Sequence, residues 1–243
     1  MMITLLEELS ANALPALQTV LWDGWLLRFA NGYTGRANSV WPLYIGTRPF
    51  AEKIEHSEQL YRARGLTPAF KLTAAAHPSG LDDALAAHGY AHQKETLVQT
   101  LTLSTQFQPH GTITPHPTEA WFTAFTQLSG LAPQHQPTLR QILGNLVPAA
   151  GFALIEKDGQ AVACGMGVVQ AGYVGLYDIV THADFRRQGY GEQLVSGLLA
   201  WAQTHGAHSA YLQVMANNPA ALSLYGKFGF QESYRYWYRI KAE

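Results

Sequence analysis

One short stretch constrains this chain more than any other: Arg186-Arg187-Gln188-Gly189-Tyr190-Gly191. It follows a largely apolar run with strand character, Val174 to Val180, and opens an amphipathic helix ended by Gly206. A glycine-rich turn from strand to helix leaves successive backbone N–H groups unpaired and pointing one way, and the helix dipole adds about half a positive charge there. With two arginines on its rim, the turn predicts a cradle for a phosphate or diphosphate. An ordinary tight turn with solvated arginines has the same sequence pattern, so this motif alone leaves both interpretations open.

A second motif runs from Asn218 to Phe230. Asn218 suits the N-cap of a helix, Pro219 its first turn and Gly229 its left-handed C-cap position. The sequence therefore predicts a short, fully capped helix. Its core-facing stripe would consist of Ala221, Leu224 and Phe228, with Tyr225 beside that stripe.

Together, RxxGxG and N-x-x-A-x-x-L-Y-x-x-x-G-F resemble the acyl-CoA-binding and catalytic segments of the GNAT superfamily of N-acetyltransferases. A predicted strand, Ala210 to Ala216, lies between the two motifs, and the ordered pair is far more specific than either motif alone. The resemblance covers about residues 112–241. It implies an α/β (α+β) fold, the GNAT acyl-CoA N-acyltransferase fold, with a mixed, mostly antiparallel sheet flanked by helices. It also implies acetyl-CoA as cosubstrate and no metal.

Composition excludes several other classes of protein. The 243 residues carry a net charge of −1 and have a pI near 6.8, which leaves no footprint for nucleic acid. No apolar run approaches the ~18 residues of a membrane-spanning helix, and no signal-peptide pattern opens the chain. We therefore expect a cytoplasmic protein, a monomer or homodimer, without nucleic-acid or membrane partners. The resemblance adds a small-molecule amine as the expected acceptor. The single cysteine, Cys164, lies in an apolar strand-like run, which favours a buried structural thiol over a nucleophile.

The sequence predicts two domains. A stretch rich in Pro, Thr and His, Gln106 to Pro117, separates two blocks of regular pattern and is the best candidate linker. We expect an N-terminal domain over residues 1–105 and a catalytic GNAT N-acetyltransferase domain over residues 112–243. Within the second, Asp158-Gly159 between two predicted strands is a strong hairpin signal.

The first block contains a hint of internal duplication. A helix predicted over about residues 51–63 is followed by Gly65, and Leu60 to Leu66 matches Leu224 to Phe230 at the Leu-Tyr-x-x-x-Gly-apolar positions. The N-terminal domain is therefore interpreted as a smaller, degenerate GNAT-like domain. Nothing in it resembles RxxGxG, so we expect it to have lost acyl-CoA binding. Chance similarity between two helix ends is the alternative.

The resemblance assigns cofactor-binding roles to the strand end, the turn and the second helix. Backbone N–H groups of the turn would hold the diphosphate, while the strand end would pair with the pantetheine arm and polarise the thioester carbonyl. Asn218 stands at a family ligand position, although an N-cap role explains it equally, and Lys227 is placed to reach phosphates or to lie in solvent. The cofactor-binding candidates are Ile179, Val180, Thr181, Arg186, Arg187, Gln188, Gly189, Tyr190, Gly191, Asn218 and Lys227.

Two residues are candidates for proton transfer. Tyr225 stands where the family's general acid stands, and a phenol with a pKa near 10 can donate to a departing thiolate; a core tyrosine is the alternative. Asp178 lies on the strand where an acidic residue in some relatives draws the amine proton through water; a structural hydrogen-bonding role is the alternative. Glu192 departs from the family pattern, which usually has a small or hydroxyl residue there. We expect its carboxylate to point away from the ligand.

The leading interpretation is an N-acetyltransferase that moves an acetyl group from acetyl-CoA to a primary amine of a small-molecule or peptide acceptor. The amine would attack directly in a ternary complex. A non-catalytic acyl-CoA-binding regulator or scaffold is the alternative, and Tyr225 argues against it because binding alone needs no phenol. An enzyme of an unrelated nucleotide cofactor ranks last, since the chain lacks a Walker lysine-serine pair and a G-x-G-x-x-G fingerprint.

Overall fold

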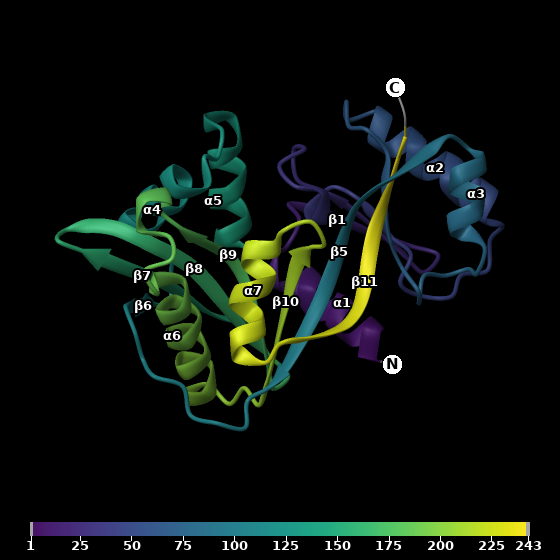
Figure 1. The fold of residues 1–243 in the computed structure, drawn as a ribbon. Coiled ribbons are helices and arrows are strands. Elements are labelled where there is room, and N and C mark those ends of the chain that lie inside the picture. The colour runs from purple at the N-terminus through teal and green to yellow at the C-terminus, as the bar shows by residue number, and fades with distance from the viewer. Residues whose placement is uncertain (1, 242–243) are drawn as a thin grey trace. The chain divides into compact units, whose positions relative to one another are not determined.

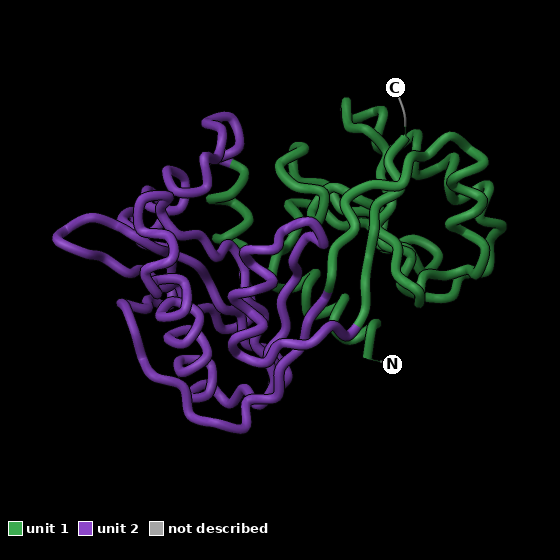
Figure 2. Tube along the Cα trace, in the orientation of Figure 1, with its two compact units in different colours: residues 1–97, 138–145, 234–243 green, residues 98–137, 146–233 purple. Residues whose placement is uncertain are grey.

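The computed structural model describes residues 2–241, which form two compact units (Figure 2). Of the described residues, unit 1 contains 2–97, 138–145 and 234–241, and unit 2 contains 98–137 and 146–233. Two segments from the second half of the sequence are thus grouped with the first half: most of helix α5 (Gln136–Gly144) and the end of strand β11 (Gln231–Lys241).

Unit 1 has the strand order β1-β2-β3-β4-β11, in which β3 and β4 are parallel and the other neighbours antiparallel. The helix predicted over about residues 51–63 is present as α2, whereas α1 and β1 were not predicted. The strand β1 is missed because its residues are mostly exposed and show no alternation. The elements are α1 (Met2–Ala13), β1 (Gln18–Trp22), β2 (Trp25–Phe29), the 3-10 turn η1 (Gly35–Ala37), β3 (Val40–Trp41), α2 (Phe50–Arg62), β4 (Ala69–Thr73), α3 (Leu81–Ala87) and the first part of β5 (Tyr90–Thr102).

A buried arginine ties the end of α1 to the sheet of unit 1. Arg28 on β2 is 1% exposed, and its guanidinium donates to the carbonyls of Ala11, Leu14 and Arg36. The guanidinium also lies over the ring of Trp41, 4.5 Å from its centroid. Carbonyls at a helix C-terminus have no intrahelical donor, so Arg28 satisfies groups that would otherwise be buried without a partner.

Unit 2 has the strand order β10-β9-β8-β7-β6, in which β9 and β10 are parallel and the other neighbours antiparallel. Figure 1 shows β7, β8 and β9 side by side, and α4 and α6 pack on these strands. The elements are the end of β5, β6 (Thr112–Thr114), α4 (Glu119–Ser129), the 3-10 turn η2 (Pro133–His135), β7 (Ala149–Lys157), β8 (Gln160–Gln170), β9 (Tyr173–Thr181), the 3-10 turn η3 (Ala183–Phe185), α6 (Tyr190–Thr204), β10 (Ser209–Met215) and α7 (Pro219–Phe228).

The predicted fold class is confirmed: a mixed, mostly antiparallel arrangement of strands is flanked by helices. The hairpin between β7 and β8 turns at Asp158 and Gly159, whose φ angles of 51° and 78° are the positive values that a type I′ turn requires. The amphipathic helix predicted to end at Gly206 is present as α6, and its apolar face is buried. This face consists of Leu194, Val195, Leu198, Leu199 and Ala202.

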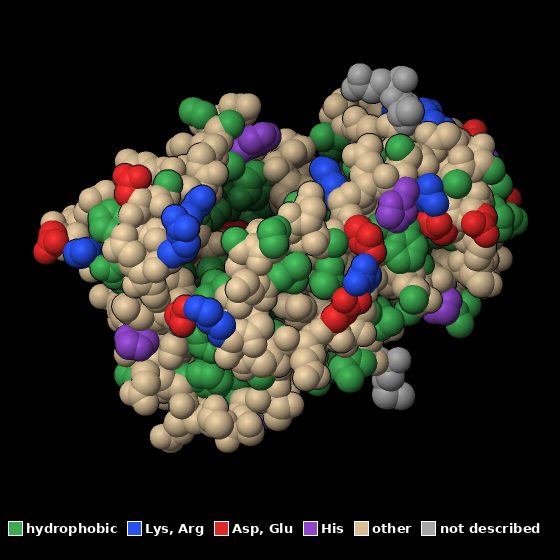
Figure 3. Space-filling model, in the orientation of Figure 1, with side chains coloured by type: hydrophobic (Ala, Val, Ile, Leu, Met, Phe, Trp, Pro, Cys, Tyr) green, Lys and Arg blue, Asp and Glu red, His purple; other side chains and the backbone are tan. Residues whose placement is uncertain are grey.

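In the view of Figure 3, acidic and basic side chains are interspersed on the surface. Among residues 2–241, none of the helices combines the length and the apolar character needed to cross a membrane.

We predict that Arg28→Met lowers the free energy of unfolding by about 2 to 3 kcal/mol, because buried carbonyl acceptors lose their charged donor while the aliphatic volume is kept. Urea unfolding followed by circular dichroism would measure the change. Arg64→Met is the matched control, since Arg64 is exposed and donates to the carbonyl of Leu60 within its own helix segment. Equal midpoints for the two variants would contradict the anchoring role of Arg28.

Candidate active site

A β-bulge in β9 shapes the centre of unit 2. The antiparallel register pairs Cys164 with Val180 and Met166 with Tyr177, so that two residues of β9, Asp178 and Ile179, oppose one residue of β8. Asp178 adopts a φ of 55°, in the left-handed region. A bulge of this kind bends its strand and increases the local twist, so β9 changes direction at Asp178.

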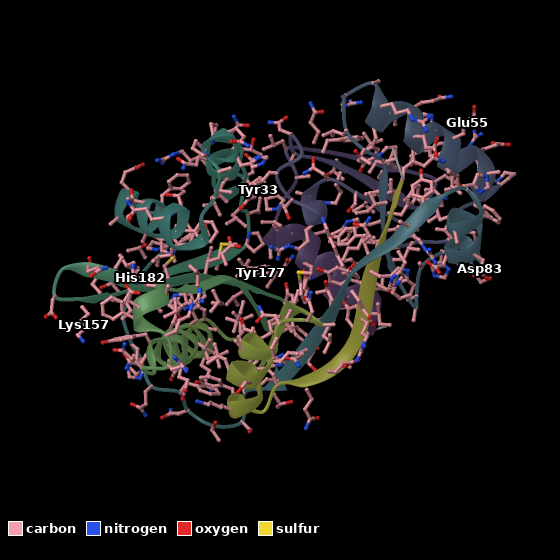
Figure 4. All side chains as sticks on the ribbon, turned by 45° about the horizontal axis from the view of Figure 1, so that its top comes forward. Tyr33, Glu55, Asp83, Lys157, Tyr177 and His182 are labelled. Carbon is pink, nitrogen blue, oxygen red and sulfur yellow. The ribbon has the colours of Figure 1, made fainter. Side chains whose placement is uncertain are left out.

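The pairing of β9 with β10 ends next to the bulge. The parallel register runs from Ser209–Tyr173 to Leu212–Leu176, while β9 continues to Thr181 and β10 to Met215. We call the separated strand ends, Tyr177–Thr181 and Gln213–Met215, the fork. Figure 4 labels Tyr177, the first residue of the β9 arm, and His182, which follows its last residue. On the side away from β8, this arm presents backbone groups beyond the β10 ladder, as an edge strand does.

The residue opposite the bulge is a glycine for a steric reason. A Cβ on Gly165 would lie 2.5 Å from Cδ1 of Ile179, closer than real Cβ atoms approach. The indole N–H of Trp121 on α4 donates to the carbonyl of Gly165 at 3.0 Å. Since a bulge disrupts the ladder locally, this bond supplies a donor from a helix where the sheet is irregular.

The glycine-rich turn follows the 3-10 turn η3, which comes after the β9 arm of the fork, and leads into α6. Gly189 is the N-cap of α6 with a φ of 87°, and it has no side chain to compete for the helix N-terminus. The backbone ladder begins with the bond from Gln193 N to Gly189 O, 2.9 Å, so the N–H groups of the residues before Gln193 precede the intrahelical bonds. A Cβ on Gly189 would meet a first protein atom only at 3.9 Å. The turn thus has the geometry of an anion cradle with open space before it.

The helix α7 lies against the cradle. A Cβ on Gly191 would contact Leu224 of α7 and the hydroxyl of Thr181, both at 3.4 Å. The predicted caps are confirmed, because the side chain of Asn218 accepts the N–H of Ala221 at 3.1 Å and Gly229 has a φ of 88°. The capping bond accounts for the side-chain oxygen of Asn218 without any ligand.

Tyr225 is the buried residue of α7, with 7% of its surface exposed. The predicted core-facing stripe of α7 was wrong, because Ala221, Leu224 and Phe228 are only partly buried and Tyr225, expected beside them, is the buried residue. The ring packs edge-on against Phe230, with centroids 5.9 Å apart. Burial raises the pKa of the Tyr225 hydroxyl to about 12, so the phenol keeps its proton throughout the neutral range.

The unusual Glu192 is paired across the cradle. Its carboxylate forms an ion pair with the ammonium of Lys227 on α7, and the side chains are 46% and 58% exposed. Such an exposed pair adds little stability. It does, however, place the positive charge of Lys227 beside the carboxylate of Glu192, the residue that follows the second glycine of the turn.

The predicted site residues lie on two parts of unit 2. The strand end, the turn and the start of α6 form one continuous segment that carries most of them, and the contacts of Leu224 and Lys227 place α7 beside it. Sequence reasoning missed Gly165 and Trp121. An isolated glycine within a strand pattern is the signal that points to a bulge, whereas nothing local marks Trp121 as its donor.

The cysteine is structural, as the sequence predicted. Cys164 is fully buried, and burial together with the charge of Asp178 raises the pKa of its thiol to about 12. A thiolate nucleophile is therefore not formed at neutral pH. No cluster of three or more His, Cys, Asp or Glu side chains that could hold a metal ion occurs among residues 2–241.

Comparison with known proteins gives the family. Residues 2–239 match the family described as the probable histone acetyltransferase Rv0428c C-terminal family. The chain is 34% identical over 243 residues to the uncharacterized N-acetyltransferase YobR of Bacillus subtilis, covering 97% of each chain.

Solved structures share the fold at lower identity. A GCN5-related N-acetyltransferase from Kribbella flavida aligns with a TM-score of 0.67 at 16% identity, covering 98% of this chain and 95% of that one. A tandem GNAT protein from the clavulanic acid biosynthesis pathway aligns with a TM-score of 0.66 at 14% identity, covering 98% and 88%. The fork, the cradle and these matches lead to one conclusion: the chain belongs to the Rv0428c C-terminal acetyltransferase family of the GNAT superfamily and is an acyl-CoA-dependent N-acetyltransferase.

Proposed function

We propose that this enzyme transfers the acetyl group of acetyl-CoA to a primary amine of a small-molecule or peptide acceptor, by direct attack in a ternary complex. One observation carries the proposal: the strand that leaves its neighbour at the fork is followed, after the short 3-10 turn η3, by an anion cradle at a helix N-terminus. A thioester with a long polar arm and a diphosphate fits this order of an open strand edge followed by backbone N–H donors.

The residues divide the work of binding. Backbone groups of Ile179, Val180 and Thr181 on the β9 arm pair with the pantetheine arm, as an added strand would. The N–H groups of the turn, Gln188 to Gly191, bind the diphosphate, with Arg186 and Arg187 adding positive charge from exposed positions. Tyr190, Asn218 and Lys227 complete the proposed binding set.

The chemistry needs two proton transfers. The nitrogen lone pair of the amine attacks the thioester carbonyl, a C–N bond forms, and the C–S bond breaks as the thiolate leaves. The developing oxyanion accepts a hydrogen bond from a main-chain N–H of the β9 arm. We assign the proton given to the sulfur to Tyr225, whose phenol is neutral at physiological pH because burial raises its pKa.

We assign removal of the amine proton to Asp178, acting through water. Its place at the bulge supports this assignment, because the positive φ turns this residue out of the regular pleat. Asp178 is half-buried and lies at the point where β9 opposes Gly165 of β8. A carboxylate at the start of the fork stands near the carbonyl that the β9 arm would hold.

We also propose that residues 1–105 are a degenerate GNAT-like domain and residues 112–243 the catalytic one. The two matching helix ends support this, because Leu66 N bonds to Tyr61 O at 3.0 Å just as Phe230 N bonds to Tyr225 O at 3.3 Å. The hydroxyl groups of Tyr61 and Tyr225 have different surroundings. The hydroxyl of Tyr61 donates to Arg28 O at 2.9 Å and accepts from Arg28 N at 3.2 Å, so it is committed to the backbone of β2.

We predict that Tyr225→Phe lowers kcat about 10²- to 10⁴-fold with little change in acetyl-CoA affinity, because only proton donation to the thiolate is lost. A thiol-release assay with an amine panel and calorimetry with acetyl-CoA would measure the two quantities. Because the Tyr225 pKa is raised to about 12, wild-type kcat should show no alkaline loss from this group below about pH 10. Tyr61→Phe is the control, expected to lower thermal stability and leave kcat unchanged. Unchanged turnover in Tyr225→Phe would remove it as the acid.

We predict that Gly189→Ala raises the Kd for acetyl-CoA at least about tenfold, whereas Gly206→Ala does not. Both glycines have a positive φ and neither faces a close protein atom, so each alanine costs about 1 kcal/mol of backbone strain. Only Gly189 lies in the cradle, where the added methyl group would enter the space before the N–H donors. Equal affinities in the two variants, measured by calorimetry, would refute the cradle assignment.

The ion pair on the cradle rim gives another prediction. Lys227→Gln should raise the Kd for acetyl-CoA about 3- to 10-fold at low salt, because Glu192 is left to repel the diphosphate. Adding Glu192→Gln to this variant should restore most of the affinity. If the double variant stays as weak as the single one, Lys227 contacts the phosphates itself instead of neutralising Glu192.

A further inference from the structure

A buried pair of tyrosines joins β9 to β10 beside the fork. The hydroxyl of Tyr177 donates to the hydroxyl of Tyr211 at 2.9 Å, and the rings meet edge to face with centroids 6.2 Å apart. Both residues are almost fully buried, with 2% and 1% of their surfaces exposed. The pair is therefore a fixed part of the sheet and not a surface contact.

A glycine makes room for the two rings. Gly175 lies on the same face of β9 as Tyr177 by strand alternation, and it is paired in register with Tyr211. A Cβ on Gly175 would lie 2.6 Å from atoms of both rings. The absence of a side chain at Gly175 thus allows the ring of Tyr177 to lie over this glycine, next to Tyr211 of β10.

The hydroxyl bond lies at the point where the strands separate. The last backbone pair is Leu176 with Leu212, Tyr177 is the next residue of β9, and Asp178 begins the bulge. Further pairing would close the fork, and fraying toward Tyr173 would widen it. A side-chain bond of defined length beside the last backbone pair opposes both changes.

We propose that Tyr177 and Tyr211 are positioning residues for acyl-CoA, which fix the width of the fork through their shared hydrogen bond. The inference rests on the proposed function, in which the arm of acetyl-CoA binds the backbone of the β9 arm. Backbone hydrogen bonds weaken steeply when distance or angle departs from the optimum. A small change in the width of the fork therefore weakens the backbone hydrogen bonds along the whole arm of acetyl-CoA. The groups that transfer protons stay in place.

The test is a double-mutant cycle of Tyr177→Phe and Tyr211→Phe. Each single variant should raise the calorimetric Kd and the KM for acetyl-CoA about 3- to 10-fold, with kcat within about twofold of wild type. The double variant should be no weaker than the weaker single variant, because all three lack the same bond. If one single variant does not fold, the other still removes the bond and carries the test.

Tyr61→Phe serves as the matched control, because it also removes a buried tyrosine hydroxyl that is hydrogen-bonded, but in unit 1. It should lower the thermal midpoint without moving the Kd. If the tyrosine pair were purely structural, its variants would likewise lower the thermal midpoint and leave the Kd for acetyl-CoA unchanged. Unchanged Kd values in the three variants therefore overturn the proposal. Effects that multiply in the double variant also overturn it, since they show independent roles. A wild-type protein that does not bind acetyl-CoA refutes the proposed function first, and the inference with it.

Discussion

The bulge at Asp178 is the constraint on which the rest of unit 2 depends. By placing two residues of β9 opposite Gly165, it turns the strand away from β10 and ends the parallel ladder at Leu176. The irregularity is supported from three directions: Gly165 leaves space for Ile179, Trp121 donates to the carbonyl of Gly165, and the tyrosine pair holds the strands together just before they part. An open strand edge inside a sheet is costly unless something binds there, which is why such a feature indicates a ligand site.

The cradle and the fork both present backbone groups outside a regular ladder. On the side away from β8, the β9 arm lies beyond its last pair with β10, and in the cradle the N–H groups at the start of α6 precede the intrahelical bonds. Side chains contribute mainly by their absence, as at Gly189, or by tuning charge, as in the pair of Glu192 with Lys227. In the proposed function backbone groups bind the cofactor, so the residues that provide them need no distinctive side chains.

The two units show what becomes of similar helix ends in different surroundings. A glycine with positive φ lies four positions after each of Tyr61 and Tyr225. The carbonyl of each tyrosine accepts a hydrogen bond from the backbone N–H five positions later. The hydroxyl of Tyr61 bonds to the backbone of Arg28 on β2, the same arginine whose side chain holds α1, so Tyr61 serves stability. Burial alone dominates the environment of Tyr225 and keeps its phenol protonated.

Local chemistry allowed the sequence alone to determine the cradle, the caps of α7 and the β7–β8 hairpin. Glycines that need positive φ, an N-capping Asn218 and an Asp158-Gly159 turn act within a few residues, so each could be predicted and each is present. Tertiary structure decided the bulge, the Gly165–Trp121 bond, the tyrosine pair and the placement of α5 with the first half of the chain. These features depend on contacts between residues far apart in sequence, for which hydrophobic periodicity carries no signal.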